Sequence, residues 1–180
     1  EVSEAKPPIY SGRDIIRPAI DPDWGAVWER GQELLVLTKD MRLMAGLLLA
    51  GLSTGGPARM AEVCDYILKT VNDYWDSFLP PAEDGDDHYE RIKPLKEALE
   101  GPRFSKAFST AVLFRSARIG DITSRFTEVA LDGSLKAENE FVLDREGFEQ
   151  FLKDEPAAAE GLTIAAQAAL ASAKMLTEIE

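Results

Sequence analysis

Apolar residues recur along most of the chain at the three- and four-residue spacing of an amphipathic helix. The clearest stripe lies between residues 60 and 78 and comprises Met60, Val63, Cys64, Ile67, Leu68, Val71, Tyr74, Trp75 and Phe78. Its steps of three and one keep a single helical face apolar over about five turns. The pattern predicts a long helix that ends at Pro80 and Pro81, because proline cannot continue a helix.

Two further helices are predicted before this stripe. One begins at Trp24, where Asp21 or Asp23 can cap it. The next runs from about Lys39 and is apolar nearly all round, which is typical of a central buried helix. Gly55, Gly56 and Pro57 then close that helix and open the one described above.

The second half of the chain gives weaker signals. We expect helices over residues 89–100, around 104–111, over 145–152 and from Pro156 to Ile179, with Asp144 as a cap. Residues 112–114 and 125–130 favour short strands, and extended structure is expected only within about 112–141. The predicted fold is mostly α, an irregular multi-helix bundle whose core includes Leu47 and Leu68 and whose three tryptophans are largely buried.

The prolines divide the chain into two parts. Residues 1–22 contain four prolines and little periodicity, so we interpret them as an N-terminal arm, with residues 23–180 as a single helical domain. The chain does not begin with methionine. We therefore expect it to be a fragment of a longer protein.

Composition excludes several classes of function. Thirty-two acidic and 20 basic residues give a net charge of −12. The chain therefore has no overall electrostatic attraction to nucleic acid or to an anionic membrane. The longest apolar run is too short to cross a bilayer. One cysteine, Cys64, and one histidine, His88, leave no basis for a disulfide, a cysteine metal site or most triad chemistry. We expect no catalytic residues, no cofactor and no metal site, and a cytoplasmic location.

An acidic segment, Glu83–Asp87, is the remaining candidate for a metal-binding or catalytic site. It lacks the twelve-residue spacing and terminal glutamate of a calcium-binding EF-hand loop. An unrecognised enzyme that uses paired carboxylates, such as Asp84 and Asp86, is the alternative to a binding function.

Short motifs follow one another in a specific order. They are Asp23-Trp24, Glu33-Leu34-Leu35, Thr38-Lys39-Asp40-Met41-Arg42, Tyr74-Trp75-Asp76 before Pro80-Pro81, Arg115-Ser116-Ala117-Arg118-Ile119-Gly120, and Thr127-Glu128-Val129-Ala130. Over roughly residues 11–130 this order resembles the ImpA-type N-terminal domain of TssA-like proteins of the bacterial type VI secretion system.

The resemblance implies a non-catalytic, cytoplasmic assembly module. Its partners would be baseplate, sheath or tube components of the contractile tail. Proteins with this domain commonly form rings through a C-terminal domain, so oligomerisation would use a region beyond residue 180. A regulatory, sheath-limiting relative is a further alternative.

The motif residues have a structural interpretation and a functional one. Structurally, Asp23 caps a helix, Trp24, Tyr74 and Trp75 pack in the core, and Lys39, Asp40 and Arg42 begin a helix, with Arg42 paired to a carboxylate such as Asp76. Functionally, the same residues would line a recognition surface. Three arginines form the one basic concentration, and either pair with the chain's own carboxylates or contact a partner: Arg115, Arg118 and Arg125.

Overall fold

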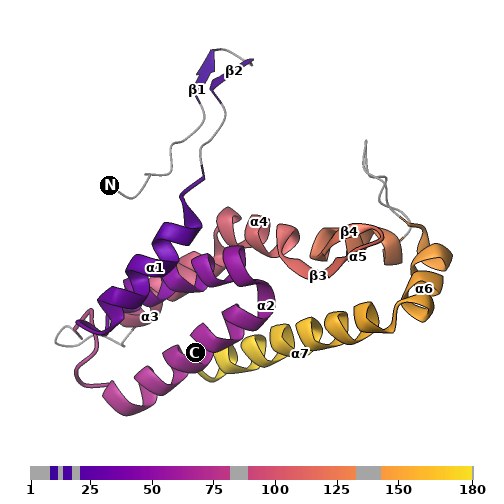
Figure 1. Ribbon diagram of the computed structural model, residues 1–180. Coiled ribbons are helices and arrows are strands. Elements are labelled where there is room, and N and C mark those ends of the chain that lie inside the picture. Colours follow the sequence, from indigo (N-terminus) through magenta and orange to yellow (C-terminus); the bar gives the residue numbers. More distant parts are fainter. Residues whose placement is uncertain (1–8, 12–13, 18–20, 82–88, 133–142, 180) are drawn as a thin grey trace.

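A computed structural model describes residues 9–11, 14–17, 21–81, 89–132 and 143–179. Within these ranges helices predominate, which confirms the mostly α fold (Figure 1). The helices are α1 (Trp24–Leu35), α2 (Met41–Tyr74), α3 (Tyr89–Glu100), α4 (Pro102–Thr110), α5 (Ser124–Asp132), α6 (Arg145–Asp154) and α7 (Pro156–Ile179). The strands are β1 (Ile9–Ser11), β2 (Asp14–Arg17), β3 (Val112–Ser116) and β4 (Gly120–Thr123), paired as two antiparallel hairpins.

A sharp kink at Gly56 divides α2 into the two helices predicted from the sequence. Gly56 has φ 67° and ψ −159°, a conformation open mainly to glycine, and Pro57 follows it. A Cβ at Gly56 would lie 2.9 Å from the carbonyl oxygen of Val112. The two halves of α2 run back beside each other from this point (Figure 1), so both ends of α2 lie close together.

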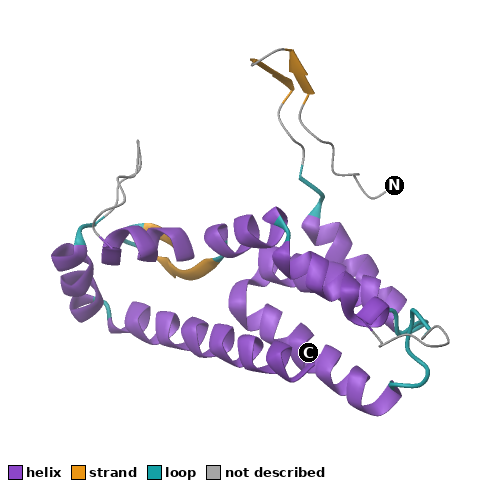
Figure 2. Cartoon of the chain, turned by 180° about the vertical axis from the view of Figure 1, so that it is seen from behind, coloured by secondary structure: helices purple, strands orange, loops and turns teal. Residues whose placement is uncertain are grey.

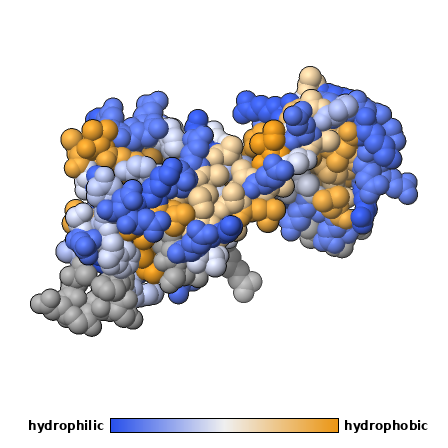
Figure 3. Space-filling model, turned by 90° about the horizontal axis from the view of Figure 1, so that it is seen from below, coloured by the Kyte–Doolittle hydropathy of each residue, from blue (hydrophilic) through white to orange (hydrophobic). Residues whose placement is uncertain are grey.

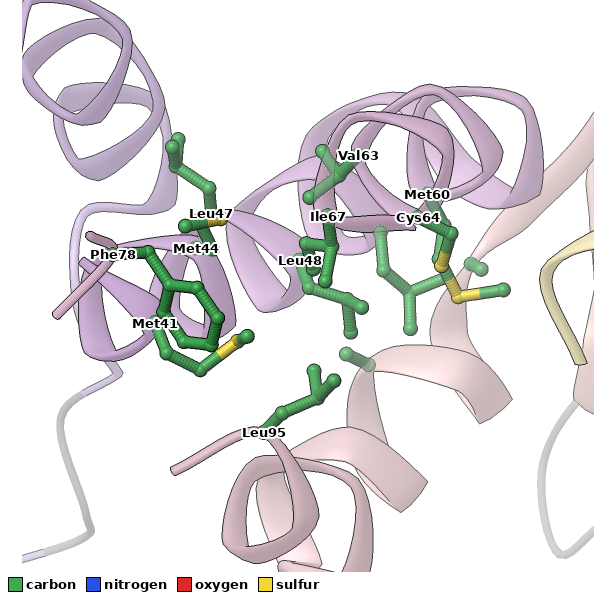
Figure 4. Close-up of a cluster of buried hydrophobic side chains, with 13 residues drawn as sticks. Met41, Met44, Leu47, Leu48, Met60, Val63, Cys64, Ile67, Phe78 and Leu95 are labelled. Atoms are coloured by element: carbon green, nitrogen blue, oxygen red, sulfur yellow. The ribbon is translucent and has the colours of Figure 1, made fainter. Parts of the chain in front are cut away.

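The main core forms between the halves of α2 and the helices around them. Met41, Met44, Leu47, Leu48 and Ile67 are each no more than 2% exposed, and α3 contributes Leu95 (Figure 4). Leu47 is therefore a core residue, as predicted.

One expectation about burial is wrong. Leu68 is only half-buried, because it lies about 100° around the helix from Ile67 and so at the edge of the buried face. Trp24, Trp28 and Trp75 are largely buried, as predicted, although none of them is fully enclosed. The rings of Trp28 and Trp75 are covered by the guanidinium groups of Arg59 and Arg91 instead of by apolar side chains alone.

A second, smaller core joins β4, α5, α6 and α7. It contains Ile122, Ala130, Phe148, Phe151 and Ala158. The expectation of a strand over 125–130 is wrong, since these residues belong to α5. The hydroxyl of Thr123 accepts from the backbone N–H of Phe126 and so caps the helix, whose Val129 and Ala130 are buried. Packing therefore overrides the β-propensity of the segment.

The N-terminal hairpin was not expected. Strands β1 and β2 pair with Tyr10 opposite Ile15, outside the region 112–141 to which extended structure was assigned. Both views show the hairpin apart from the helices (Figures 1 and 2). The segment is rich in β-branched and aromatic residues. The strands were not predicted, because the neighbouring prolines led us to interpret the whole segment as an arm without regular structure.

Candidate interaction surfaces

Two of the sequence motifs, residues 38–42 and 74–76, meet where the two ends of α2 come together. Asp40 caps α2 by accepting from the backbone N–H of Arg42 at 2.9 Å. The guanidinium of Arg42 also donates to both carboxylate oxygens of Asp40, and these hydrogen bonds lower the pKa of the Asp40 carboxyl. The expected partner of Arg42 was a carboxylate such as Asp76. The structure pairs Arg42 with Asp40 instead.

Backbone hydrogen bonds close this junction. The N–H of Leu79 donates to the carbonyl of Lys39 at 2.7 Å, and the N–H of Met41 donates to the carbonyl of Leu79 at 2.8 Å. The Lys39 ammonium lies 4.3 Å from the centre of the Tyr74 ring, a cation–π contact. The motif residues therefore hold the start of α2 against the segment that follows its end.

Arg91 of α3 completes the junction, and sequence reasoning missed it. Its side chain is buried and donates to the carbonyls of Phe78 at 2.8 Å and Pro80 at 3.1 Å. The guanidinium carbon lies 4.0 Å from the centre of the Phe78 ring and 4.8 Å from that of Trp75. Arg91 precedes the buried Leu95 by four residues, so the helical period already placed it on the inward face.

The remaining motif residues follow the structural interpretation in part. Asp23 caps α1, accepting from the N–H of Ala26 at 3.0 Å. Trp24 lies beside it and lines a shallow hollow that also includes Ser53 and Arg103. Asp76 is exposed to solvent.

The three arginines lie on or beside the β3–β4 hairpin. Arg115 is 3.4 Å from the carboxylate of Asp121, and Arg118 is 3.7 Å from that of Asp154. All of these side chains are largely exposed, so the two ion pairs add little stability. No ion pair of Arg125 occurs within the described ranges.

Ser116 fixes the turn that carries Arg118. Its buried hydroxyl donates to the carboxylate of Glu155 at 3.0 Å and accepts from the N–H groups of Arg118 and Ile119 at 3.1 and 3.3 Å. Glu155 links α6 to α7. The hairpin turn is therefore anchored to the helices, while the Arg118 side chain remains 64% exposed.

An open apolar groove of about 540 Å³ lies among α4, α5, α6 and α7. Phe108 and Leu131, which are 38% and 46% exposed, stand in its wall. The groove contains mainly aliphatic and aromatic side chains with three hydroxyl groups from Ser124, Thr127 and Thr163. Such a lining suits an apolar side chain of a protein partner.

Groups with catalytic potential are few in the described ranges. Burial raises the pKa of the Cys64 thiol to about 11, so the thiol stays protonated at neutral pH. No group of three or more metal-binding side chains occurs in these ranges. Asp84, Asp86 and His88 lie outside the described residues. Of the helices that the structure describes, none is long and apolar enough to cross a membrane.

Comparison with known proteins agrees with the resemblance drawn from the motifs. Residues 3–100 match the family described as "ImpA, N-terminal, type VI secretion system". The sequence motifs extend over residues 11–130, so those after residue 100 lie outside this match. They include the three arginines. No curated protein matches the chain.

The fold is also similar to a solved structure. This is the N-terminal domain, including the conserved ImpA_N region, of the TssA component of the type VI secretion system from Burkholderia cenocepacia. The two share 22% sequence identity, with a TM-score of 0.56, over 87% of this chain and 68% of that one. At this identity the likeness concerns the fold.

Proposed function

The chain belongs to the family of ImpA N-terminal domains of the type VI secretion system, and from this premise we propose that it is a non-catalytic module that binds baseplate, sheath or tube components during tail assembly. The observation that carries the proposal is the family match over residues 3–100. The proposal includes a cytoplasmic location, an arm over residues 1–22 and a single binding domain over 23–180. Oligomerisation of the whole protein through a C-terminal region is part of the same proposal.

The β3–β4 turn is the contact surface we assign to this function. Arg118 stands on a turn that Ser116 anchors, so the backbone that carries its guanidinium is already fixed before binding. Its ion pair with Asp154 is long, at 3.7 Å, and exposed, so a partner's carboxylate can replace it. Leu113, in the same hairpin, lines the apolar groove, which offers an uncharged anchor nearby. These features favour a partner with an acidic patch.

Charge reversal tests this surface. The immobilised chain is exposed to lysate of a bacterium that expresses the secretion system, and the captured proteins are identified by mass spectrometry. We expect wild-type chain to retain a baseplate, sheath or tube protein, and Arg118→Glu to retain at least about tenfold less, since a like charge replaces an attractive one. Added salt should also weaken capture.

Arg145→Glu is the matched control. Arg145 is an exposed arginine on α6 with its own ion pair to Glu149 at 3.2 Å, so its reversal changes net charge equally but at another place. Equal capture by both variants would exclude the hairpin turn as the contact. Capture that improves in both would favour a basic partner that recognises the acidic surface instead.

A further inference from the structure

The outward face of α7 carries a regular pattern of exposed residues. Among the exposed residues of this helix, five recur at spacings of four, three, four and three: Glu160, Ile164, Gln167, Ala171 and Lys174. Alternating steps of four and three are the repeat by which helices pair in coiled coils. The opposite face, with Ala158, Ala165 and Ser172, is buried against the rest of the chain.

This outward face is apolar to a degree unusual for this protein. None of the residues from Gly161 to Ala173 is charged, in a chain that is 29% charged overall. Ile164 is 54% exposed and Leu170 is 71% exposed. The side of the molecule seen in Figure 3 carries an apolar band across its middle, with both hydrophilic and apolar patches toward the two ends. A surface helix without charges and with protruding aliphatic side chains is typical of a helix–helix interface.

The charges at the two ends of the face indicate what covers it. Glu160 and Lys174 stand at equal distances along the helix from Gln167, seven residues on either side. In an antiparallel pair of two α7 helices centred on Gln167, Glu160 of each copy faces Lys174 of the other. A parallel pair would instead bring like charges together. The charges on this face are therefore complementary to those of a second copy only when the two helices run antiparallel.

We propose that the chain forms a symmetric dimer in which α7 packs antiparallel against α7 of a second copy. Ile164 and Leu170 then flank the contact on its two sides, and the two Gln167 amides meet at the twofold axis. Small Ala171 allows the backbones to approach closely. The two Glu160–Lys174 pairs close the ends. Lys174 can form them, because its ion pair with Glu178 is long, at 4.0 Å, and exposed to solvent.

The size of the face sets the strength of the dimer. The contact involves only residues 160–174, about 21 Å of one helix. It therefore buries less surface area than the interface of a stable complex. The net charge of −12 also opposes association of two copies. We therefore expect a weak, reversible dimer, which does not depend on the function proposed above.

Sedimentation equilibrium of the whole chain tests the proposal, over about 10 μM to 1 mM and in about 0.15 M salt. The weight-average mass should rise with concentration from 19.8 kDa toward twice that value. Glu160→Lys and Lys174→Glu should each weaken association at least about tenfold, since each places like charges at both ends of the interface. The double variant, with both reversals, should associate within about threefold of wild type.

The control is Glu128→Lys, which makes the same charge change at an exposed position on α5. It should associate as wild type does or slightly better. Circular dichroism is expected to be unchanged in every variant, because all of the altered side chains are exposed. A chain that remains monomeric over the whole range would overturn the proposal. So would a dimer that is indifferent to Glu160→Lys, or a double variant as weak as the single ones.

Discussion

Arg91 joins three parts of the chain through a single buried side chain. It donates to the carbonyls of Phe78 and Pro80 and lies against the rings of Phe78 and Trp75. Hydrogen bonds from a charged donor are among the stronger ones in proteins. The segment after α2 is therefore held by a polar contact that no apolar residue can replace.

Removal of this side chain should destabilise the fold. Arg91→Ala leaves the Phe78 and Pro80 carbonyls without their donor and opens a space beside two aromatic rings, so we expect a loss of about 2–4 kcal/mol in the free energy of unfolding. Urea denaturation followed by circular dichroism measures it. Lys93→Ala, which removes an exposed cation from the same helix, should cost under about 0.5 kcal/mol. Similar losses in both variants would mean that Arg91 does not anchor the junction.

At the scale of elements, the kink in α2 decides how the helices pack. Gly56 adopts positive φ, and its α carbon faces the backbone of β3. The kink brings both halves of α2 around one core and places β3 at the bend. A straight helix of the same length would leave the apolar residues of its two halves apart.

Substitution of this glycine separates backbone strain from general helix propensity. Gly56→Ala should lower the free energy of unfolding by about 1–3 kcal/mol, because its Cβ meets the Val112 carbonyl and the positive φ is strained. Gly46→Ala, in the first half of α2, meets no atom within 4 Å and should raise stability by about 0.5–1 kcal/mol. Thermal unfolding should thus shift in opposite directions. A shift in the same direction would contradict the role of Gly56.

Over the whole molecule, helices whose limits are marked in the local sequence were predictable, and a helix that depends on packing was not. The limits of α3 and α7 agree with the sequence prediction, because proline, glycine and apolar periodicity mark them directly. Segment 125–130 has β-forming residues but becomes helical, since only the folded chain supplies the contacts of Phe126 with Phe148.

The candidate surfaces show the same division. Capping by Asp23 and Asp40 follows from local sequence, and the structure confirms both. The partner of Arg42 is Asp40, two residues before it. A carboxylate more distant in the sequence, such as Asp76, was expected instead. The groove among α4 to α7 was not predictable, because it is lined by residues of several elements whose relative positions no local pattern specifies.

The central claim is that this chain binds a component of the type VI tail. Isothermal titration of the purified chain against purified baseplate, sheath and tube proteins, one at a time, tests it most directly. The account predicts saturable binding to at least one of them, weakened by Arg118→Glu and unchanged by Arg145→Glu. Absence of binding to every component, with the chain folded by circular dichroism, would contradict it.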